Sequence, residues 1–286
     1  MLRIPMSIQA PTTAARLQPG FAGRYGRWAL VAGASEGLGA AYARGLAARG
    51  LDLALVARRR PLLETLAQRL TAEYGVQTRC IDGDLSNRGF LDSLLQECAA
   101  LEVGLLVYNA AYAPVGEFAS LVVDDLLRVA AVNIEGPVTL VRGLVPGMIS
   151  RGRGGIILMT SLAGNQGSPY IATYAASKAF NRVLAEGLWY ELKGKGVDVL
   201  ACCAGAVRTP GYSGASSGKD APGTLDPDDV AEQALRALGR GPVVIPGRVN
   251  RLANAFMTRL LPRRQAIKIM ASNTADVLPA AGEDDR

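Results

Sequence analysis

The sequence predicts an α/β protein built as one doubly wound, Rossmann-like domain, with a mostly seven-stranded parallel sheet and helices on both faces. Two observations lead to this fold class. From Arg27 onward, short apolar runs of strand length alternate with longer helix-like stretches, a pattern typical of parallel strands joined by crossover helices. A chain of 286 residues with 49% hydrophobic content is also long enough to bury a large single core, and its 33 glycines suit tight strand-to-helix turns.

The expected elements follow one another along the chain. The seven strands are Trp28–Ala32, Leu51–Ala57, Val76–Ile81, Val103–Tyr108, Gly155–Thr160, Val197–Cys203 and Pro242–Ile245. Helices are expected near 38–49, 61–74, 87–100, 122–150, 173–194 and 227–239. The long Gly- and Ser-rich stretch Gly205–Asp226 is expected to be a lid or a binding loop, with a disordered insertion as the alternative.

Three segments are expected along the chain. Residues 1–25 form an N-terminal extension that holds three arginines, three prolines and no acidic residue, and lacks the apolar run of a secretion signal. We expect it to be disordered or loosely docked, with organelle targeting as a weaker alternative. Residues 26–248 form the main domain, and residues 249–286 form a C-terminal helical segment with a flexible tail.

Composition disfavours several classes of function. The formal charge of +6 comes from scattered basic residues, and the densest clusters, Arg58–Arg60 and Arg263–Arg264, are not interleaved with aromatic residues, so no nucleic-acid partner is expected. The four cysteines lack metal-binding spacing and the chain has no histidine, so we expect no metal site and reduced thiols in a cytoplasmic protein. No run of 18 apolar residues exists, and no transmembrane segment is expected.

Proton transfer near neutral pH must rely on another residue than histidine. Tyr174 and Lys178 stand four positions apart within the sequence Thr-Tyr-Ala-Ala-Ser-Lys, and on a helix such residues share one face. The lysine ammonium would then favour the phenolate and lower the tyrosine pKa from about 10. The alternative is a surface lysine beside a packed tyrosine, because this spacing also arises by chance.

A glycine-rich turn follows the first strand directly. It reads Gly33-Ala-Ser35-Glu36-Gly37-Leu38-Gly39 and leads into a helix start. Glycine permits positive φ and close backbone approach, and the free amides of a helix N-terminus favour a phosphate. A nucleotide phosphate is therefore expected at this turn.

The second strand ends in Ala57-Arg58-Arg59 with no acidic residue. In nucleotide-binding folds an acid at this place bonds the ribose hydroxyls, whereas arginine accommodates a 2′-phosphate. NADP is therefore favoured over NAD, unless these arginines are a solvated helix start.

Further polar residues stand at or near the carboxyl ends of the strands, where open parallel sheets bind ligands. They include Asp84-Leu85 after the third strand, Asn109-Ala110-Ala111 after the fourth, and Ser161 after the fifth. Asn133 lies inside a helical stretch, for which asparagine is a poor former. Each of them alone could be a cap, a turn or an edge residue.

Together these motifs resemble the short-chain dehydrogenase/reductase family across about residues 26–250. Gly33, Gly37 and Gly39 match its cofactor loop, and the order and spacing of four residues, Asn133, Ser161, Tyr174 and Lys178, match its catalytic tetrad. The start of the first strand, the Leu-Val-Ala-Arg end of the second, and the segment Leu144–Met148 also resemble the branch of 3-oxoacyl and 17β-hydroxysteroid reductases. Four positions depart from the family pattern, namely Ala32, Tyr108, Ala111 and Ala204.

The resemblance implies hydride transfer between a nicotinamide and an alcohol or carbonyl carbon, within a dinucleotide-binding catalytic domain at 26–248. Tyr174 would exchange the proton, Ser161 would orient the substrate oxygen, Lys178 would hold the nicotinamide ribose, and Asn133 would position a water. The residues expected to bind NADP are Gly33, Ser35, Glu36, Gly37, Leu38, Gly39, Arg58, Arg59, Asp84, Leu85, Asn109, Ala110, Ala111, Tyr174, Lys178, Gly205, Val207 and Thr209. The alternative is an NADP-binding sensor or scaffold subunit of the same fold with little turnover; a nucleotide-sugar epimerase is disfavoured by the short C-terminal segment.

Candidate substrate contacts are mostly apolar and suggest a hydrophobic ketone or acyl derivative; they are Leu162, Ala163, Gln166, Tyr170, Tyr212 and Met257. The loop Gly211–Gly223 and the chain beyond Val249 are expected to close over the substrate. For the latter, a helix packed on the core and a membrane-surface contact remain alternatives.

A homodimer or homotetramer is expected, because two helical stretches are apolar on more than one face. The residues that suggest this are Val129, Val132, Leu140 and Val141 in one stretch, and Phe180, Leu184, Leu188 and Trp189 in the other.

Overall fold

The computed structural model describes residues 20–215 and 220–275. Its centre is one seven-stranded sheet in the order β3-β2-β1-β4-β5-β6-β7, in which every neighbouring pair is parallel. The strands are β1 Trp28–Ala32, β2 Asp52–Ala57, β3 Thr78–Asp82, β4 Leu105–Tyr108, β5 Gly154–Ser161, β6 Val197–Ala204 and β7 Val243–Val244. The fold class predicted from the sequence is confirmed.

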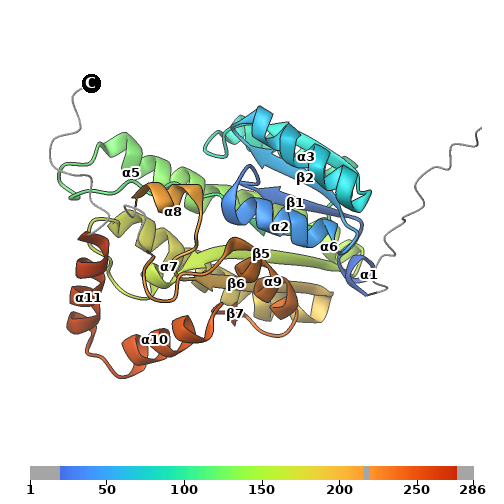
Figure 1. The fold of residues 1–286 in the computed structure, drawn as a ribbon. Helices are drawn as coiled ribbons and strands as arrows, with labels where there is room; N and C mark the ends of the chain where they lie inside the picture. Colours follow the sequence, from blue (N-terminus) through green and yellow to red (C-terminus); the bar gives the residue numbers. More distant parts are fainter. Residues whose placement is uncertain (1–19, 216–219, 276–286) are drawn as a thin grey trace, which may run out of the picture.

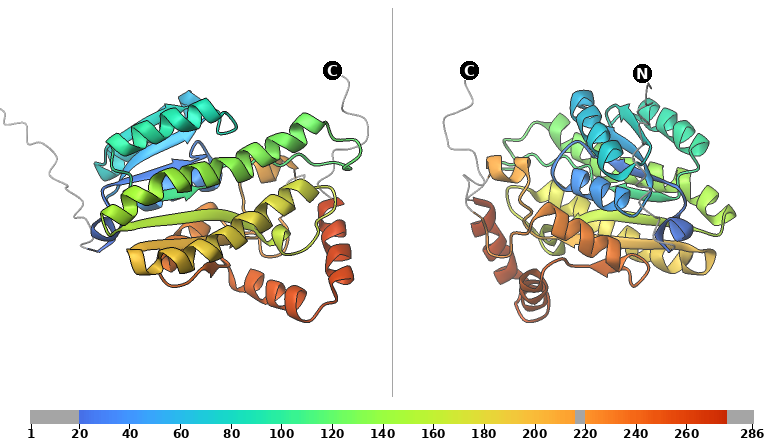
Figure 2. Two further views of the ribbon diagram at one scale, coloured as in Figure 1. Left: turned by 180° about the vertical axis from the view of Figure 1, so that it is seen from behind. Right: turned by 45° about the vertical axis from the view of Figure 1, so that its right-hand side comes forward.

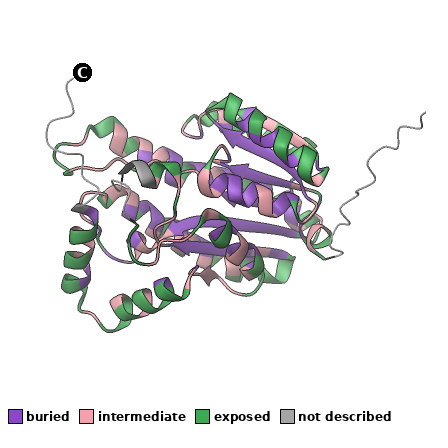
Figure 3. Cartoon of the chain, in the orientation of Figure 1, coloured by how far each residue is buried: buried purple, intermediate pink, exposed green. Residues whose placement is uncertain are grey.

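Helices cover both faces of the sheet (Figures 1 and 2). On one face lie α1 Phe21–Tyr25, α2 Gly37–Ala47, α3 Arg60–Tyr74 and α9 Pro227–Ala237, and on the other lie α4 Arg88–Ala100, α6 Gly136–Ser150 and α7 Ala172–Leu192. Successive strand residues alternate between these two layers, since Val31 packs with the first set and Leu30 with the second. In Figure 3 the strands are coloured purple as buried, and the helices that cover them are partly green as exposed.

All seven expected strands are present; β1 has the expected bounds, and at least one end of each other strand is shifted. The seventh is reduced to two residues at the sheet edge, where Pro242 and Pro246 flank it and cannot donate ladder hydrogen bonds. The helix expected over 122–150 is divided into α5 Val123–Ala130, a π-helical turn η1 Ala131–Glu135, and α6. Within the stretch expected to be irregular, the structure contains the short helix α8 Pro210–Ala215.

The residues just before β1 belong to the folded body. Tyr25, at the end of α1, is 1% exposed and joins the core, and its hydroxyl donates to Asp198 at 2.9 Å. At the other end, α10 Arg248–Arg259 and α11 Arg263–Ala275 follow β7. In Figures 1 and 2 these two helices lie at the periphery of the molecule, outside the two layers that cover the sheet.

The residues proposed for an oligomer interface do not form a free apolar stripe. Val129, Val132, Leu140 and Val141 are all buried within the monomer, and Leu140 and Val141 belong to the core on one face of the sheet. The helical wheel of the sequence could not show this, because the sheet and α4 together cover more than one face of this helix. Of the residues named for the interface, Phe180 is exposed, and the other exposed apolar residues of these helices are Val123, Leu127, Val138, Val183 and Tyr190.

No helix among the described residues is long and apolar enough to cross a membrane. All four cysteines are free thiols, and Cys98, Cys202 and Cys203 are buried.

Candidate active site

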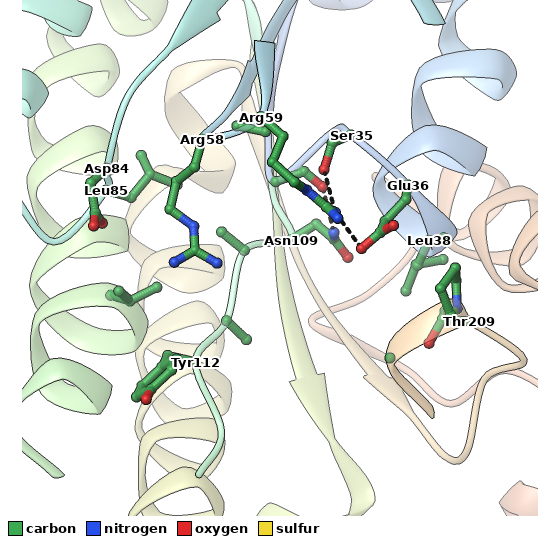
Figure 4. A pocket seen from close by; sticks show the side chains of 18 of the residues that line it. Ser35, Glu36, Leu38, Arg58, Arg59, Asp84, Leu85, Asn109, Tyr112 and Thr209 are labelled. Atoms are coloured by element: carbon green, nitrogen blue, oxygen red, sulfur yellow. Dashed lines mark hydrogen bonds and ion pairs between the residues drawn. The ribbon is translucent and has the colours of Figure 1, made fainter. Parts of the chain in front are cut away.

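The sheet reverses its strand order between β1 and β4, and open parallel sheets bind ligands beside such a switch point. A cavity of about 420 Å³ opens there, at the carboxyl ends of β1, β2, β3 and β4 (Figure 4). It is lined by most of the residues expected to bind the cofactor: Gly33, Ser35, Glu36, Gly37, Leu38, Arg58, Arg59, Asp84, Leu85, Asn109, Ala110, Ala111, Val207 and Thr209. Gly39, Tyr174, Lys178 and Gly205 do not line it.

The glycine turn has a physical reason for each of its three glycines. Gly33 has a φ of +84°, and a Cβ there would lie 2.7 Å from the backbone nitrogen of Ala110. Gly37 has a φ of +54° and faces Thr209, while a Cβ on Gly39 would lie 1.8 Å from the carbonyl oxygen of Gly33. Asn109 locks the turn to β4 because its Nδ2 donates to that same carbonyl at 2.9 Å.

The start of α2 is suited to an anion. Its first turn holds no acidic residue, and no side chain caps its free amides. These amides and the helix dipole favour a phosphate at the mouth of the cavity. A dinucleotide fits this cradle, and when bound it would supply or accept a hydride at its nicotinamide ring.

The two arginines after β2 take different roles. Arg59 pairs with Glu36 at 2.5 Å and lies 3.4 Å from the Ser35 hydroxyl, so it neutralises the acid of the glycine turn. Arg58 forms no ion pair or hydrogen bond with the described residues, and Figure 4 shows its guanidinium pointing into the cavity. Of the two, Arg58 is therefore the arginine that is available to an anionic ligand.

Asp84 marks the opposite wall of the cavity. Burial pushes its pKa up, but the N–H and hydroxyl of Ser86 and the charges of Arg128 and Arg58 outweigh burial, so the pKa lies below its usual value. Arg128 pairs with Asp84 at 2.8 Å and also covers the Tyr112 ring. Arg128, Tyr112 and Val132 also line the cavity, and none of them was expected in the cofactor site, because none belongs to a motif that matches the family.

Asn133 is fully buried in the π-helical turn η1, and its side chain joins two parts of the site. Its Oδ1 accepts from the Tyr112 backbone N–H at 2.8 Å, and its Nδ2 donates to the Tyr112 carbonyl at 2.9 Å and the Ser177 hydroxyl at 3.0 Å. Ser177 in turn donates to the Tyr174 carbonyl at 2.7 Å. The amide of Asn133 thereby connects the cavity wall to the helix that carries Tyr174 and Lys178.

The other three tetrad residues come from β5 and α7. Ser161 ends β5, and its hydroxyl accepts from the Ala163 N–H at 3.2 Å and is hydrogen-bonded to Tyr174. The Lys178 ammonium lies 5.4 Å from the centre of the Tyr174 ring and donates to the Met159 carbonyl at 3.0 Å. All four residues of the tetrad are thus brought together.

The expected lowering of the Tyr174 pKa by Lys178 is not what the structure shows. Burial raises the pKa of Tyr174, and the hydrogen bond with Ser161 only partly offsets it. Burial also lowers the pKa of Lys178 to about 8, because the ammonium is removed from water with one carbonyl as its partner. Sequence spacing places the two groups on one face, but it does not report how deeply they are buried.

The six candidate substrate contacts do not line the cofactor cavity. Ala163 and Gln166 are buried beside the end of β5, and Tyr170 has a φ of +65°, a strained value for a non-glycine residue, just before α7. Of the loop Gly211–Gly223, residues 216–219 lie outside the described part of the chain.

The apolar stripe of α10 does not wall the cavity either. Val249, Leu252, Phe256 and Leu260 are exposed to solvent, and Met257 is partly buried. The helix is anchored instead by Asn250, whose Nδ2 donates to the Gly223 and Pro246 carbonyls. The Asn250 side chain also packs so closely against Gly205 that a Cβ at position 205 would lie 2.9 Å from its Nδ2.

Comparison with known proteins identifies the class. Residues 27–219 match the family model described as short chain dehydrogenase, and the chain belongs to this family. It is 33% identical over 233 residues to a 7β-hydroxysteroid dehydrogenase of Clostridium sardiniense, a match covering 81% of this chain and 89% of the relative. It is 36% identical over 190 residues to a very-long-chain 3-oxoacyl-CoA reductase of Anas platyrhynchos, covering 65% of this chain and 60% of that protein.

Two solved structures share the fold. One, from a study of 7β-hydroxysteroid dehydrogenase stereoselectivity, has a TM-score of 0.82 at 26% identity and covers 87% of this chain and 98% of its own. The other is a short-chain dehydrogenase from Sphingobium yanoikuyae in complex with NADPH, with a TM-score of 0.71 at 29% identity. The match covers 91% of this chain and 99% of the Sphingobium chain. The protein is therefore a nicotinamide-dependent oxidoreductase acting on hydroxyl or carbonyl groups. Within the family it falls in the hydroxysteroid and 3-oxoacyl branch.

Proposed function

We propose that the protein is an NADPH-dependent reductase of hydrophobic ketones or acyl derivatives, with Tyr174 as the proton donor. The observation that carries this proposal is the assembly of Ser161, Tyr174 and Lys178 on one side of Asn133, with the cofactor cavity on the other. A scaffold or sensor protein would need the cavity but not a buried tyrosine and lysine on a helix joined to its wall through Asn133.

The chain's own residues support the reductive direction. A raised pKa keeps Tyr174 protonated near neutral pH, so its hydroxyl can donate to a substrate carbonyl oxygen. The nicotinamide would supply the hydride to the carbonyl carbon, and the product is a secondary alcohol. Ser161 would hold the oxygen in line, and Lys178 would return the lost proton and hold the nicotinamide ribose. Asn133 would position the water that links Lys178 to solvent.

Preference for NADP rests on Arg58 and on the lack of an acid after β2. Bidentate arginine is well matched to phosphate, and the one nearby acid of the glycine turn, Glu36, is neutralised by Arg59. The structurally similar Sphingobium dehydrogenase was solved with NADPH, which agrees with this preference.

A hydrophobic substrate is supported by the relatives. Their names specify a hydroxysteroid and a very-long-chain 3-oxoacyl-CoA, two substrate classes with large apolar parts. Addition of a 7-oxosteroid, a long 3-oxoacyl thioester and an aromatic ketone should test the range. At least one of these compounds is expected to cause NADPH oxidation. A protein that only binds NADPH would oxidise it in the presence of none of the three compounds.

We also propose a homodimer or homotetramer in the cytoplasm. Support comes from the exposed apolar residues Leu127, Val138, Phe180 and Val183 on neighbouring helices, and from four free thiols. Light scattering at micromolar concentration is expected to give a multiple of the 30.0 kDa chain mass. A monomeric mass would contradict the assembly, and recovery in a periplasmic fraction would contradict the location.

A further inference from the structure

In the π-helical turn that carries Asn133, the carbonyl of the preceding residue, Val132, receives no hydrogen bond from a helix N–H. The Gly136 N–H donates to the Ala131 carbonyl, five residues back, instead of to Val132. The next residue is Pro137, which has no N–H. The Val132 carbonyl therefore receives neither the donor of an α-helix nor that of a π-helix.

Tyr108 supplies the missing donor. It is the last residue of β4 and 2% exposed, and its hydroxyl donates to the Val132 carbonyl at 2.6 Å. Burial raises the pKa of Tyr108, so the hydroxyl stays protonated and can act as a donor. The bond joins the centre of the sheet to the π-helical turn.

Gly136 provides the space for this contact. A Cβ at position 136 would lie 2.2 Å from the Tyr108 hydroxyl oxygen, closer than any real contact. Glycine is otherwise a poor residue at the start of a helix of this length, since alanine favours helix by about 1 kcal/mol. Tyr108, Gly136 and Pro137 therefore form one local arrangement.

The neighbouring carbonyl is satisfied in the same way. In an α-helix the Asn133 carbonyl would accept from residue 137, which is proline, and here the Asn181 Nδ2 donates to it at 2.8 Å. Asn181 is itself 2% exposed and belongs to α7. Side chains from the sheet and from α7 thus hold the two carbonyls that flank the Asn133 Cα, those of Val132 and of Asn133 itself.

We propose that Tyr108 is a positioning residue, which acts through Asn133 by holding the π-helical turn in place. Its hydroxyl touches neither the cavity nor the tetrad, and its effect passes through the backbone of Val132 to the amide that bonds Tyr112 and Ser177. This inference deepens the proposed function and rests on it. Tyr108 is one of the four positions at which this chain departs from the family pattern.

The test compares two buried tyrosines. Tyr108→Phe leaves the Val132 carbonyl without a donor, and kcat for ketone reduction is expected to fall about tenfold, with the Kd for NADPH within about twofold of wild type. The matched control is Tyr25→Phe, which removes the hydroxyl of a similarly buried tyrosine near the opposite ends of the strands. It is expected to lower Tm but to leave kcat unchanged.

Gly136→Ala provides the second variant. It should displace the Tyr108 hydroxyl and lower kcat to a similar extent, although alanine is the better helix former. In the double variant Tyr108→Phe/Gly136→Ala the losses should not add, because both remove the same bond. A wild-type kcat in Tyr108→Phe, an equal loss in Tyr25→Phe, or additive losses would each overturn the inference.

Hydrogen exchange separates this inference from the proposed function. The amides of residues 131–136 are expected to exchange faster in Tyr108→Phe than in wild type or Tyr25→Phe, whether or not a substrate is known. If none of the tested ketones caused wild type to oxidise NADPH, and the difference in exchange still appeared, the proposed activity would fail and the positioning role of Tyr108 would stand. Unchanged exchange at these amides would refute the positioning itself.

Discussion

Tyr174→Phe is expected to reduce kcat for ketone reduction by at least about 100-fold, the lower end of what a positioned acid contributes. The substitution removes the one hydroxyl that is hydrogen-bonded to Ser161 and lies beside the Lys178 ammonium. The ring remains, so packing and the cofactor cavity should be preserved. Fluorescence titration should give a Kd for NADPH within several-fold of wild type.

The control for this variant is Tyr190→Phe on the same helix, at a residue that is 80% exposed. It should leave both kcat and Kd unchanged. Retention of more than about a tenth of kcat in Tyr174→Phe would show that another group donates the proton.

In wild type, the rate of reduction should also fall as the pH rises through about 8, where buried Lys178 loses its proton and can no longer return one to Tyr174.

Arg58→Asp should shift the ratio of kcat/KM for NADPH over NADH by roughly 100-fold toward NADH, because it exchanges a charge-assisted phosphate contact for repulsion. Arg58 points into the cavity without a partner among the described residues, whereas Arg59 is held by Glu36. The new carboxylate can also accept from the ribose hydroxyls of NADH. Steady-state kinetics with each cofactor at one ketone concentration measures the ratio.

Arg69→Asp makes the same change of charge on the exposed side of α3 and serves as the control. It should leave the ratio of the two cofactors unchanged. An equal shift in both variants would mean that net charge, and not a contact to the 2′-phosphate, sets the preference. An unchanged ratio in Arg58→Asp would remove this residue from the cofactor site.

The sequence predicted the sheet and its parallel strands, because these depend on local patterns, whereas the tetrad was inferred from the resemblance to the family. Apolar runs fixed β1, β2 and β4 to within a few residues, and the positive φ of Gly33 and Gly37 agrees with their place in the turn. The spacing of Tyr174 and Lys178 placed them on one helix face, as found.

What could not be predicted depends on contacts between distant segments. The π-helical turn at Asn133 accepts a hydrogen bond from Tyr108 of β4, and Glu36 is neutralised by Arg59 from the end of β2. The apolar residues Leu140 and Val141 were taken for part of a free stripe, but the sheet and α4 bury them from two sides. The Tyr174 pKa also depends on burial, which spacing along a helix does not reveal.

The central claim is that this chain transfers a hydride from NADPH to a carbonyl carbon while Tyr174 supplies the proton. The most direct measurement is the mass of the alcohol formed from a 7-oxosteroid or a long 3-oxoacyl thioester with NADPH that carries deuterium at the transferred position. We expect one deuterium on the new carbinol carbon with wild type, and no product above background with Tyr174→Phe. Absence of deuterated alcohol with wild type across the panel, while NADPH is bound, would contradict the claim.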